Sequence, residues 1–412
     1  MHTISKNKQY YKFCFYGFLK NLRFFDAFFI LFLIEKGLSF TEIGSLYAIR
    51  EIFINVFEIP SGIIADTYGR KNSLITSFFA YIISFYIFYT SYNFWIFILA
   101  FIFYGIGDAF RTGTHKGMIM DYLKLNNWSN QKIQYYGHTR SCSQKGSAIS
   151  SLLAGLIVFY SGSYQSIFLY SIIPYIFNLI LIFSYPKELN FSSKKKSDKN
   201  KIATTFLSFF KTIKQPNVLR IINTSAVHSA YLQSVKDYIQ PLMVNVAIIL
   251  PFMLNIDADK KNGLVIGIIY FLIYIANSRA SKIASKYSNF KNGRISYYTL
   301  LFGFSFGLLT GLFFYYNLWV LSLLTFVGIF LVENIRKPIL TGFISDNVSN
   351  DILTSVISAQ SQLKTIITAT LAFTFGVIAD NFGIGISIAV VSVILLFISL
   401  ILNIFSNNLS SK

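Results

Sequence analysis

The stretch from Gly62 to Lys71, which reads GIIADTYGRK, decides how the rest of the chain is interpreted. It lies between two apolar segments of helix-spanning length, predicted at 41–65 and 73–92. Gly62 allows two helices to approach closely, and Gly69 permits a tight turn with a positive φ. The stretch is therefore expected to be a short polar link between two membrane helices.

The charges of this link predict its contacts. Asp66 can lie near the positive N-terminal end of a neighbouring helix. Arg70 or Lys71 can pair with a carboxylate at a helix end on the same side, and we expect Asp121 to be that partner. Such contacts would hold helix ends together rather than bind a ligand.

The composition of the whole chain indicates a membrane protein. Only 13% of the 412 residues are charged and 54% are hydrophobic, whereas soluble domains carry about 25% charged residues. Apolar runs of about 20 residues, enough to span a bilayer as a helix, recur along the chain and leave no room for a soluble domain. Twelve spans are predicted, all helical because backbone groups in lipid must be satisfied within the segment, at 12–34, 41–65, 73–92, 94–119, 137–160, 164–185, 218–249, 263–284, 296–316, 318–343, 355–379 and 385–405.

The formal net charge of +19 does not indicate a nucleic-acid partner, because such binding needs a basic face on a soluble module. Lys and Arg instead collect in alternate links between spans. By the positive-inside rule, both termini and the long central link are cytoplasmic, in an inner, multi-pass membrane protein. The first span runs through Lys20, Arg23 and Asp26 with no small-residue cleavage site, so we expect it to be retained.

Two six-helix halves are predicted, at 1–186 and 217–412, joined by a basic cytoplasmic linker at 187–216. An internal repeat supports this division, because many transporters are built from repeats. Each half carries an acid, a base three residues on and a second acid ten residues further on, in its fourth span. The two triples are Asp108, Arg111 and Asp121, and Glu333, Arg336 and Asp346.

Charged residues within spans are costly and by default face a bundle interior or a water-filled cavity. Spans one, four, seven and ten each carry an acid and a base near mid-depth, and spans two and five add further charges. The predicted solute and proton pathway comprises Arg23, Asp26, Arg50, Glu51, Asp108, Arg111, Arg140, Lys236, Asp237, Glu333 and Arg336.

Two interpretations of these pairs stay open. Three pairs have a spacing of three residues, which places both partners on one helical face, so they could be self-neutralising struts that lock helix packing. They could also line a polar central cavity in which ion pairs break and reform. Lys236 and Asp237 are adjacent and are expected to point apart.

The central positions hold slightly more bases than acids, which favours an anionic or zwitterionic solute. Desolvation can raise the pKa of a buried carboxylate far enough for it to carry a proton. The candidate proton carriers are Asp26, Glu51, Glu58, Asp108, Asp237 and Glu333. His228 is expected to be a solvated or packing residue rather than a proton relay.

The link from Gly62 to Lys71 resembles the signature loop of the major facilitator superfamily, Gly-x-x-x-Asp-(Arg/Lys)-x-Gly-Arg-(Arg/Lys), with Thr67 in place of the usual base. The resemblance implies an all-α membrane fold of two six-helix pseudo-symmetric bundles and a secondary transporter that works by alternating access, with its solute site between the halves. It also implies a gate that breaks as the protein opens inward, formed by Gly62, Asp66, Gly69, Arg70, Lys71 and Asp121. A second stretch, Gly376 to Gly383, resembles the first half of this motif and is predicted to be a turn.

Other functions are weighed against this expectation. Antiporters of the superfamily carry a Gly-Pro-rich motif in span five, but this span has no proline, which weakens a multidrug efflux role. An integral membrane transferase would need a paired-acid or His cluster, and a transport-inactive scaffold would not need charges inside the membrane. We therefore expect no enzyme activity, cofactor or metal, a small solute and protons as partners in the lipid bilayer, and a monomer.

Overall fold

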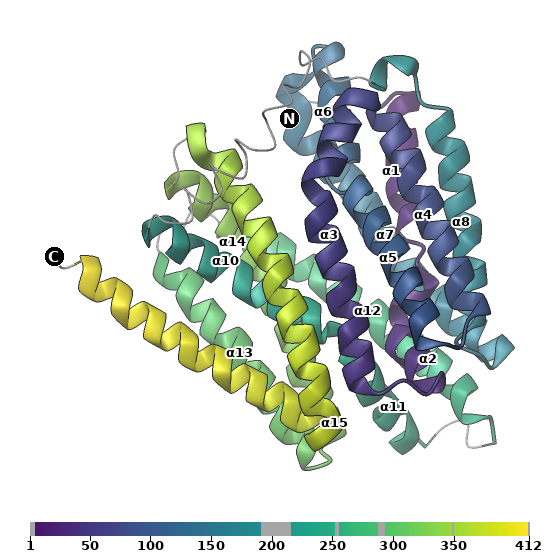
Figure 1. Cartoon of the computed structure of the whole chain (residues 1–412), viewed down its shortest axis with the longest axis vertical. Helices are drawn as coiled ribbons and strands as arrows, with labels where there is room; N and C mark the ends of the chain where they lie inside the picture. Colours follow the sequence, from purple (N-terminus) through teal and green to yellow (C-terminus); the bar gives the residue numbers. More distant parts are fainter. Residues whose placement is uncertain (1–4, 191–215, 252–254, 287–292, 348–349, 411–412) are drawn as a thin grey trace. The chain divides into compact units, whose positions relative to one another are not determined.

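The computed structural model describes the chain except for residues 1–4, 191–215, 252–254, 287–292, 348–349 and 411–412. Within this part every regular element is a helix (Figure 1). The elements are α1 (Lys8–Lys20), η1 (Phe24–Ala27), α2 (Phe29–Glu35), α3 (Phe40–Tyr68), α4 (Arg70–Thr90), α5 (Phe94–Arg111), α6 (Thr114–Leu125), η2 (Ser129–Gln131), α7 (Lys132–Ser161), α8 (Ser166–Phe183), η3 (Lys187–Leu189), α10 (Pro216–Val235), η4 (Lys236–Tyr238), α11 (Ile239–Ile249), α12 (Ala258–Lys286), α13 (Gly293–Tyr315), α14 (Trp319–Asn347) and α15 (Asn350–Ser410).

The described helices cover all twelve predicted spans, and the fold is that of an all-α membrane protein. Eight helical segments in this part are long and apolar enough to cross a membrane by themselves. The last of them, at 359–401, contains most of the eleventh and of the twelfth predicted span, separated at Gly383 (φ 85°, ψ 162°). The eight segments leave out the first, second and seventh spans, which are broken or carry more charge.

The first and seventh spans are both interrupted. The first was predicted to be continuous at 12–34, whereas the overlong seventh, at 218–249, was expected to kink at Pro241 or to begin later. The first consists of α1, a non-helical turn, η1 and α2, and the seventh of α10, η4 and α11. Pro241 does not cause the second break, because it lies in the first turn of α11, where its missing N–H group has no helical partner to lose. The predicted fourth span is also divided, at Gly113 (φ 81°), so Asp121 lies on α6 and not on the helix of Asp108.

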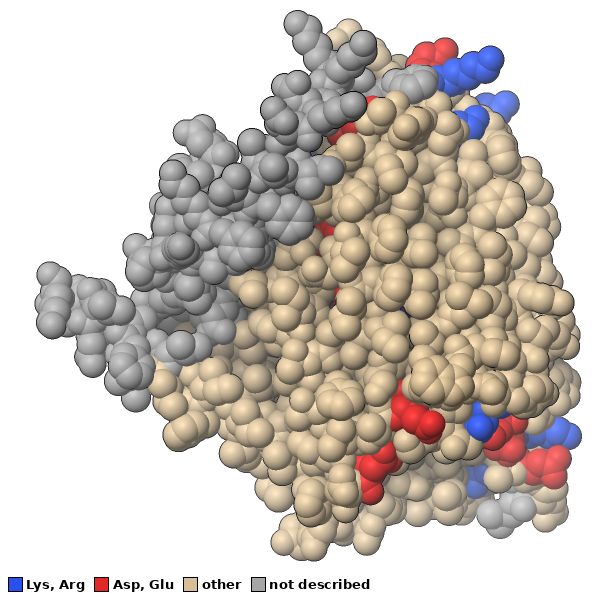
Figure 2. All heavy atoms as spheres, viewed as in Figure 1, with Lys and Arg blue, Asp and Glu red and all other residues tan. Residues whose placement is uncertain are grey.

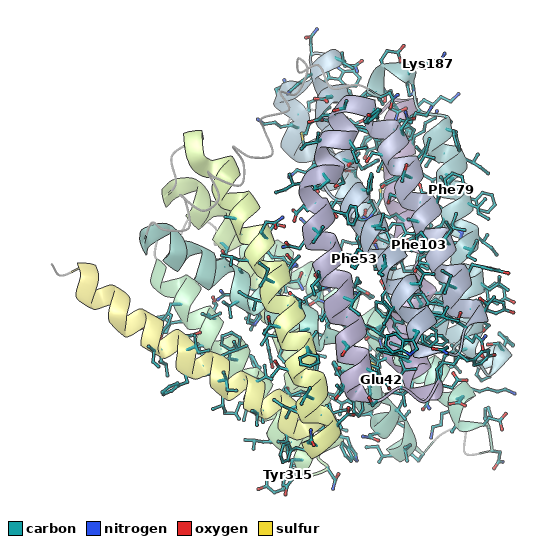
Figure 3. All side chains as sticks on the ribbon, in the orientation of Figure 1. Glu42, Phe53, Phe79, Phe103, Lys187 and Tyr315 are labelled. Atoms are coloured by element: carbon teal, nitrogen blue, oxygen red, sulfur yellow. The ribbon has the colours of Figure 1, made fainter. Side chains whose placement is uncertain are left out.

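The surface agrees with a lipid environment. Uncharged residues cover a broad band of the face in Figure 2, and the Lys, Arg, Asp and Glu side chains shown there gather mainly towards its two ends. Large apolar side chains project from the helices, such as Phe79 of α4 and Tyr315 of α13, which are 51% and 60% exposed (Figure 3). Lipid chains are as apolar as these side chains, so their exposure carries no penalty in a bilayer.

The helices gather into two compact units. The first comprises residues 1–32, 49–202 and 253–274, and the second comprises 33–48, 203–252 and 275–412. These units differ from the predicted halves in that 33–48 clusters with the second unit and 253–274 with the first. Most of the predicted linker, from 191 to 215, lies outside the described residues.

Candidate functional site

The break in the first span positions Arg23. The helix α1 ends at Lys20, Asn21 caps it, and Arg23 takes a non-helical conformation (φ −99°, ψ 85°) immediately before η1. Its guanidinium donates from Nε to the Tyr175 hydroxyl at 3.0 Å and from Nη1 to the Tyr104 hydroxyl at 2.8 Å. Two tyrosines on neighbouring helices therefore fix the planar guanidinium group of Arg23 in the interior of the first unit.

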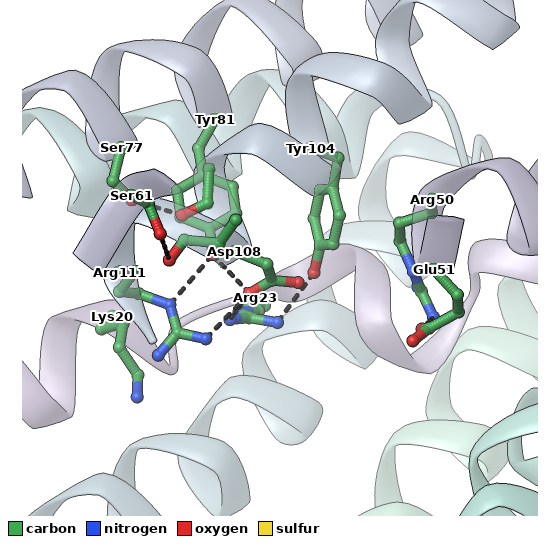
Figure 4. A network of polar contacts seen from close by, with 12 residues as sticks. Lys20, Arg23, Arg50, Glu51, Ser61, Ser77, Tyr81, Tyr104, Asp108 and Arg111 are labelled. Carbon is green, nitrogen blue, oxygen red and sulfur yellow. Dashed lines mark hydrogen bonds and ion pairs between the residues drawn. The ribbon is translucent and has the colours of Figure 1, made fainter. Parts of the chain in front are cut away.

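Asp108 of α5 is the centre of this cluster (Figure 4). Its Oδ1 atom accepts from Arg111 Nη2 at 2.8 Å and from the Tyr81 hydroxyl at 2.5 Å, and lies 3.9 Å from Arg23 Nη2. The Tyr81 oxygen in turn accepts from Arg111 Nε at 2.9 Å. One carboxylate is thus shared by two guanidiniums, which are charged under all conditions relevant to a protein.

The remaining charges of this region leave a positive excess. The Lys20 side chain lies beside Arg111 in Figure 4 and, within the described residues, has no hydrogen bond or ion pair. Arg50 and Glu51 form a buried ion pair of 2.7 Å and neutralise each other, with the Arg50 guanidinium 5.7 Å from the centre of the Tyr104 ring. The cluster therefore contains more bases than acids. The bases are Lys20, Arg23 and Arg111, and the acids are Asp26 and Asp108.

The second unit contains its own polar group around Glu333 of α14. Glu333 Oε2 lies 2.8 Å from His228 Nδ1 of α10, and Oε1 lies 3.8 Å from Lys337 Nζ and accepts a hydrogen bond from Ser229. Glu333 and His228 are both buried. A buried carboxylate on a buried imidazole is an arrangement that can exchange a proton.

Arg336 and the second broken span complete the polar groups of this unit. Arg336 is 1% exposed and donates from Nη1 to the Thr299 hydroxyl at 2.8 Å. In η4, Lys236 Nζ and Asp237 Oδ1 are 3.9 Å apart, and the Tyr47 hydroxyl donates to Asp237 Oδ2 at 3.0 Å. The charges at the break are therefore held by a short 3₁₀ turn.

These contacts bear on the expected pairings. Asp108 and Arg111 pair as their spacing predicts, and Arg23 and Glu333 also have partners on other helices. The adjacent residues Lys236 and Asp237 were expected to point apart, and they instead approach each other because η4 is not an α-helix. Arg140 is exposed on α7 and forms no hydrogen bond or ion pair within the described residues, although it lies within electrostatic range of Lys20.

Three tyrosines of these groups were not recognised in the sequence, and the role of His228 was left open. Tyr81, Tyr104 and Tyr175 lie within apolar runs, where nothing separates a tyrosine that binds a charge from one that packs. His228 is completely buried and bound to Glu333, so it is not solvated, and its ring contacts with Tyr231 and Phe304 agree with the packing role that was the other expectation. Its place inside an apolar span was the one signal that could have identified it.

The link from Gly62 to Lys71 is anchored to α6 and to the C-terminal end of α8. Arg70 Nη1 lies 2.6 Å from Asp121 Oδ2, the expected partner, and Arg70 Nη2 lies 3.5 Å from Asp66 Oδ1. Lys71 Nζ donates to the backbone oxygens of Phe183 and Tyr185 at 2.7 and 3.1 Å.

The two glycines of the link differ in their roles. Gly69 has a φ of 103°, which strains any residue with a side chain, and a Cβ there would lie 2.3 Å from the Asn190 amide oxygen, so glycine is favoured. A Cβ on Gly62 would meet no atom within 4 Å. Within the described residues of its own unit no helix approaches Gly62 closely, and the close approach expected there stays a prediction.

The comparison with known families settles which proteins share this architecture. The model of the Major Facilitator Superfamily matches residues 21–369, most of the chain. The chain belongs to the Major Facilitator Superfamily. The uncharacterised MFS-type transporter YxaM of Bacillus subtilis (strain 168) is 39% identical over 90 residues, which cover 22% of this chain and 23% of that relative.

Solved structures of the superfamily share the fold of this chain over nearly its whole length. A variant of the nucleoside transporter NupG gives a TM-score of 0.77 at 13% identity, covering 95% of this chain and 99% of that one. A POT family transporter in complex with 5-aminolevulinic acid gives 0.73 at 13% identity, covering 99% and 98%. At this level of identity the likeness establishes the fold of this superfamily member and leaves its solute open.

No group of three or more His, Cys, Asp or Glu residues is arranged to hold a metal ion in the part of the chain that the structure describes. The polar groups of this superfamily member are ion pairs and hydrogen bonds between helices. The arrangement can bind charged solutes and exchange protons.

Proposed function

We propose that this transporter moves a small anionic or zwitterionic solute by alternating access, coupled to protons, in the inner membrane. The observation that carries the proposal is the cluster in which Asp108 is shared by Arg23 and Arg111 while the amine of Lys20 has no partner among the described residues. A carboxylate or phosphate of a solute can accept from a guanidinium in a bidentate manner. Binding of this kind would compete with Asp108.

The break in the first span supports this assignment. In membrane transporters, discontinuous helices commonly form the solute and ion sites, because backbone groups freed at the break remain within a polar cavity. Arg23 lies at one break and Lys236 and Asp237 at the other. The first span of each predicted half therefore carries its charged residues at the point where the helix is interrupted.

Proton coupling is assigned to Glu333 and His228. The 2.8 Å contact between them is buried. Lys337, on the same helix as Glu333, places its Nζ atom 3.8 Å from the Glu333 carboxylate. A solute-driven change that separates the two side chains would leave an uncompensated buried charge, which a proton would neutralise. The structurally related POT family transporter binds 5-aminolevulinic acid, and this likeness supports a solute that carries both charges.

The orientation proposed for this chain follows the distribution of Lys and Arg, with both termini cytoplasmic, and the chain is proposed to act as a monomer. Multidrug efflux stays as the alternative. A cationic drug would meet Arg23 and Arg111 as like charges, which disfavours binding at this cluster. The charge class of the solute therefore separates the two functions.

A ligand screen on the purified protein tests the proposal. Thermal unfolding in detergent is measured against matched sets of anionic, zwitterionic, neutral and cationic small molecules. We expect stabilisation by members of the first two sets, lost in Arg111→Gln and retained in Arg279→Gln, whose side chain is exposed on α12. Stabilisation by cationic compounds alone, unaffected by Arg111→Gln, would favour efflux of cationic drugs.

A further inference from the structure

A groove on the surface of the first unit lies apart from the charged cluster. It is formed by α1, α7 and α8 and has a volume of about 570 Å³, within the range of small-molecule sites. Its walls are apolar and include Phe15, Phe18, Ile149 and Leu181. Phe15 and Ile149 are 51% and 41% exposed, so the groove opens to the surroundings of the unit.

Three lysines line the same groove, and no acidic residue does. Lys12 Nζ donates to the Ser184 backbone oxygen at 2.6 Å. Lys8 and Lys145 are exposed and have no hydrogen bond or ion pair within the described part of the chain. An apolar groove that carries two or more unneutralised ammonium groups is complementary to a ligand with an anionic head and an apolar tail.

Two of the three helices that form the groove, α1 and α7, run in the same direction. The Ser5 backbone N–H donates to the Gln131 side chain at 3.0 Å near their starts, and a Cβ on Gly146 would lie 2.5 Å from the Phe18 backbone oxygen. Lys8 therefore lies at the predicted cytoplasmic end of the groove, with Phe15 and Phe18 deeper. Lys145 is level with Phe18, well inside the candidate membrane span 135–161, and its side chain is exposed, so we infer that it faces lipid.

A lysine that faces lipid is costly unless it reaches the interface or finds an anion. Lys145 has a long flexible side chain that can extend along the groove towards Lys8. A phosphate bound between these two ammonium groups would pair with both of them. The acyl chains attached to that phosphate would then lie along Phe18, Ile149 and Leu181.

We propose that this groove binds one anionic phospholipid, with its phosphate between Lys8 and Lys145 and an acyl chain along α7. The site is separate from the proposed solute site and does not depend on it. A neutral lipid, free phosphate or a second copy of the chain are the other possible occupants. Charge complementarity favours the anionic lipid over all three.

Native mass spectrometry of the delipidated protein tests this proposal. Dioleoylphosphatidylglycerol and dioleoylphosphatidylcholine are offered in equal amounts to the natural chain, to Lys8→Gln/Lys145→Gln and to the matched control Lys132→Gln/Lys187→Gln. Both control lysines are exposed and do not line the groove. We expect a preference for phosphatidylglycerol of roughly 10- to 30-fold, because two lysines near a lipid headgroup together raise the affinity for an anionic lipid by about tenfold or slightly more.

The groove variant should lose this preference, and the control variant should keep it. Ile149→Trp, which fills the groove and retains every charge, should reduce the binding of both lipids. Equal binding of the two lipids by the natural chain, or equal loss in both lysine variants, would overturn the proposal. So would displacement of the lipid by inorganic phosphate, or a dimer that persists without lipid and disappears in Ile149→Trp.

Discussion

The hydroxyl group of Tyr81 joins two charges of opposite sign. It donates to Asp108 at 2.5 Å and accepts from Arg111 Nε at 2.9 Å, in a side chain that is completely buried. Charges alone identified Arg23, Asp108 and Arg111 in the sequence, because charge within an apolar span is rare. The tyrosines that orient them could not be identified, because the chain contains 27 tyrosines and most spans hold at least one.

Removing this hydroxyl tests whether Tyr81 positions the cluster. Tyr81→Phe leaves the ring in place and withdraws one hydrogen bond to each charged group, at a cost of about 1–3 kcal/mol. Tyr86→Phe is the control on the same helix, since Tyr86 is 58% exposed. We expect a lower unfolding temperature in detergent for Tyr81→Phe alone. Equal unfolding temperatures for the two variants would show that the hydroxyl does not support the cluster.

The two glycines of the link offer a matched pair of substitutions. Gly69→Ala places a Cβ at a φ of 103° and against Asn190, and strain of this kind costs about 1–3 kcal/mol. Gly62→Ala adds a methyl group to a helix with open space around it, where alanine is favoured over glycine by about 0.5–1 kcal/mol. Thermal unfolding should show a lower unfolding temperature for Gly69→Ala only. A lower unfolding temperature for Gly62→Ala instead would contradict the roles given to the two glycines.

At the scale of the elements, the positions of the helices were predictable and their interruptions were not. Long apolar runs place α4 and α8 within three residues of the predicted spans 73–92 and 164–185. The turns at Arg23 and Lys236 carry no Gly or Pro that would mark them, and they are stabilised by contacts with tyrosines and acids on distant segments. The break at Gly113, in contrast, has a signal in the sequence, because glycine readily adopts the positive φ found there.

The stretch from Gly376 to Gly383 was predicted to be a turn, but it is helical up to Gly383 and it contacts the start of α3. Asp380 accepts from the backbone N–H groups of Phe40 and Thr41 at 2.8 and 2.7 Å. A Cβ on Gly376 would lie 2.2 Å from the Phe40 backbone oxygen, so the two backbones are in close contact. This part of the motif-like stretch therefore caps α3 within the second unit.

Loss of this cap should release the start of α3. Asp380→Ala removes the acceptor of two helix N-terminal N–H groups, and such caps are worth about 0.5–2 kcal/mol. We expect faster hydrogen exchange of the amides around Phe40 and Thr41, with unchanged exchange in α4. Asn381→Ala is the control, because Asn381 is exposed and bonds only within its own helix. Identical exchange in both variants would contradict the capping role.

At the scale of the whole molecule, composition and a single link were sufficient to indicate the superfamily. The apolar runs predicted a polytopic helical protein, and the family match over residues 21–369 confirms that prediction. The solute could not be predicted, because it depends on which side chains converge in three dimensions. The gating role of Arg70, Lys71 and Asp121 stays a prediction, although the Arg70 contact with Asp121 is present.

Uptake into proteoliposomes tests the central claim, which is proton-coupled transport of an anionic or zwitterionic solute. A labelled solute that stabilises the purified protein is offered with and without an imposed pH gradient, to the natural chain, to Glu333→Gln and to Arg279→Gln. We expect the natural chain to accumulate the solute above equilibrium only when the gradient is imposed. Arg279→Gln should behave in the same way. In Glu333→Gln the solute should equilibrate without accumulating. Uptake by the natural chain that is indifferent to the gradient, or accumulation that persists in Glu333→Gln, would contradict the central claim.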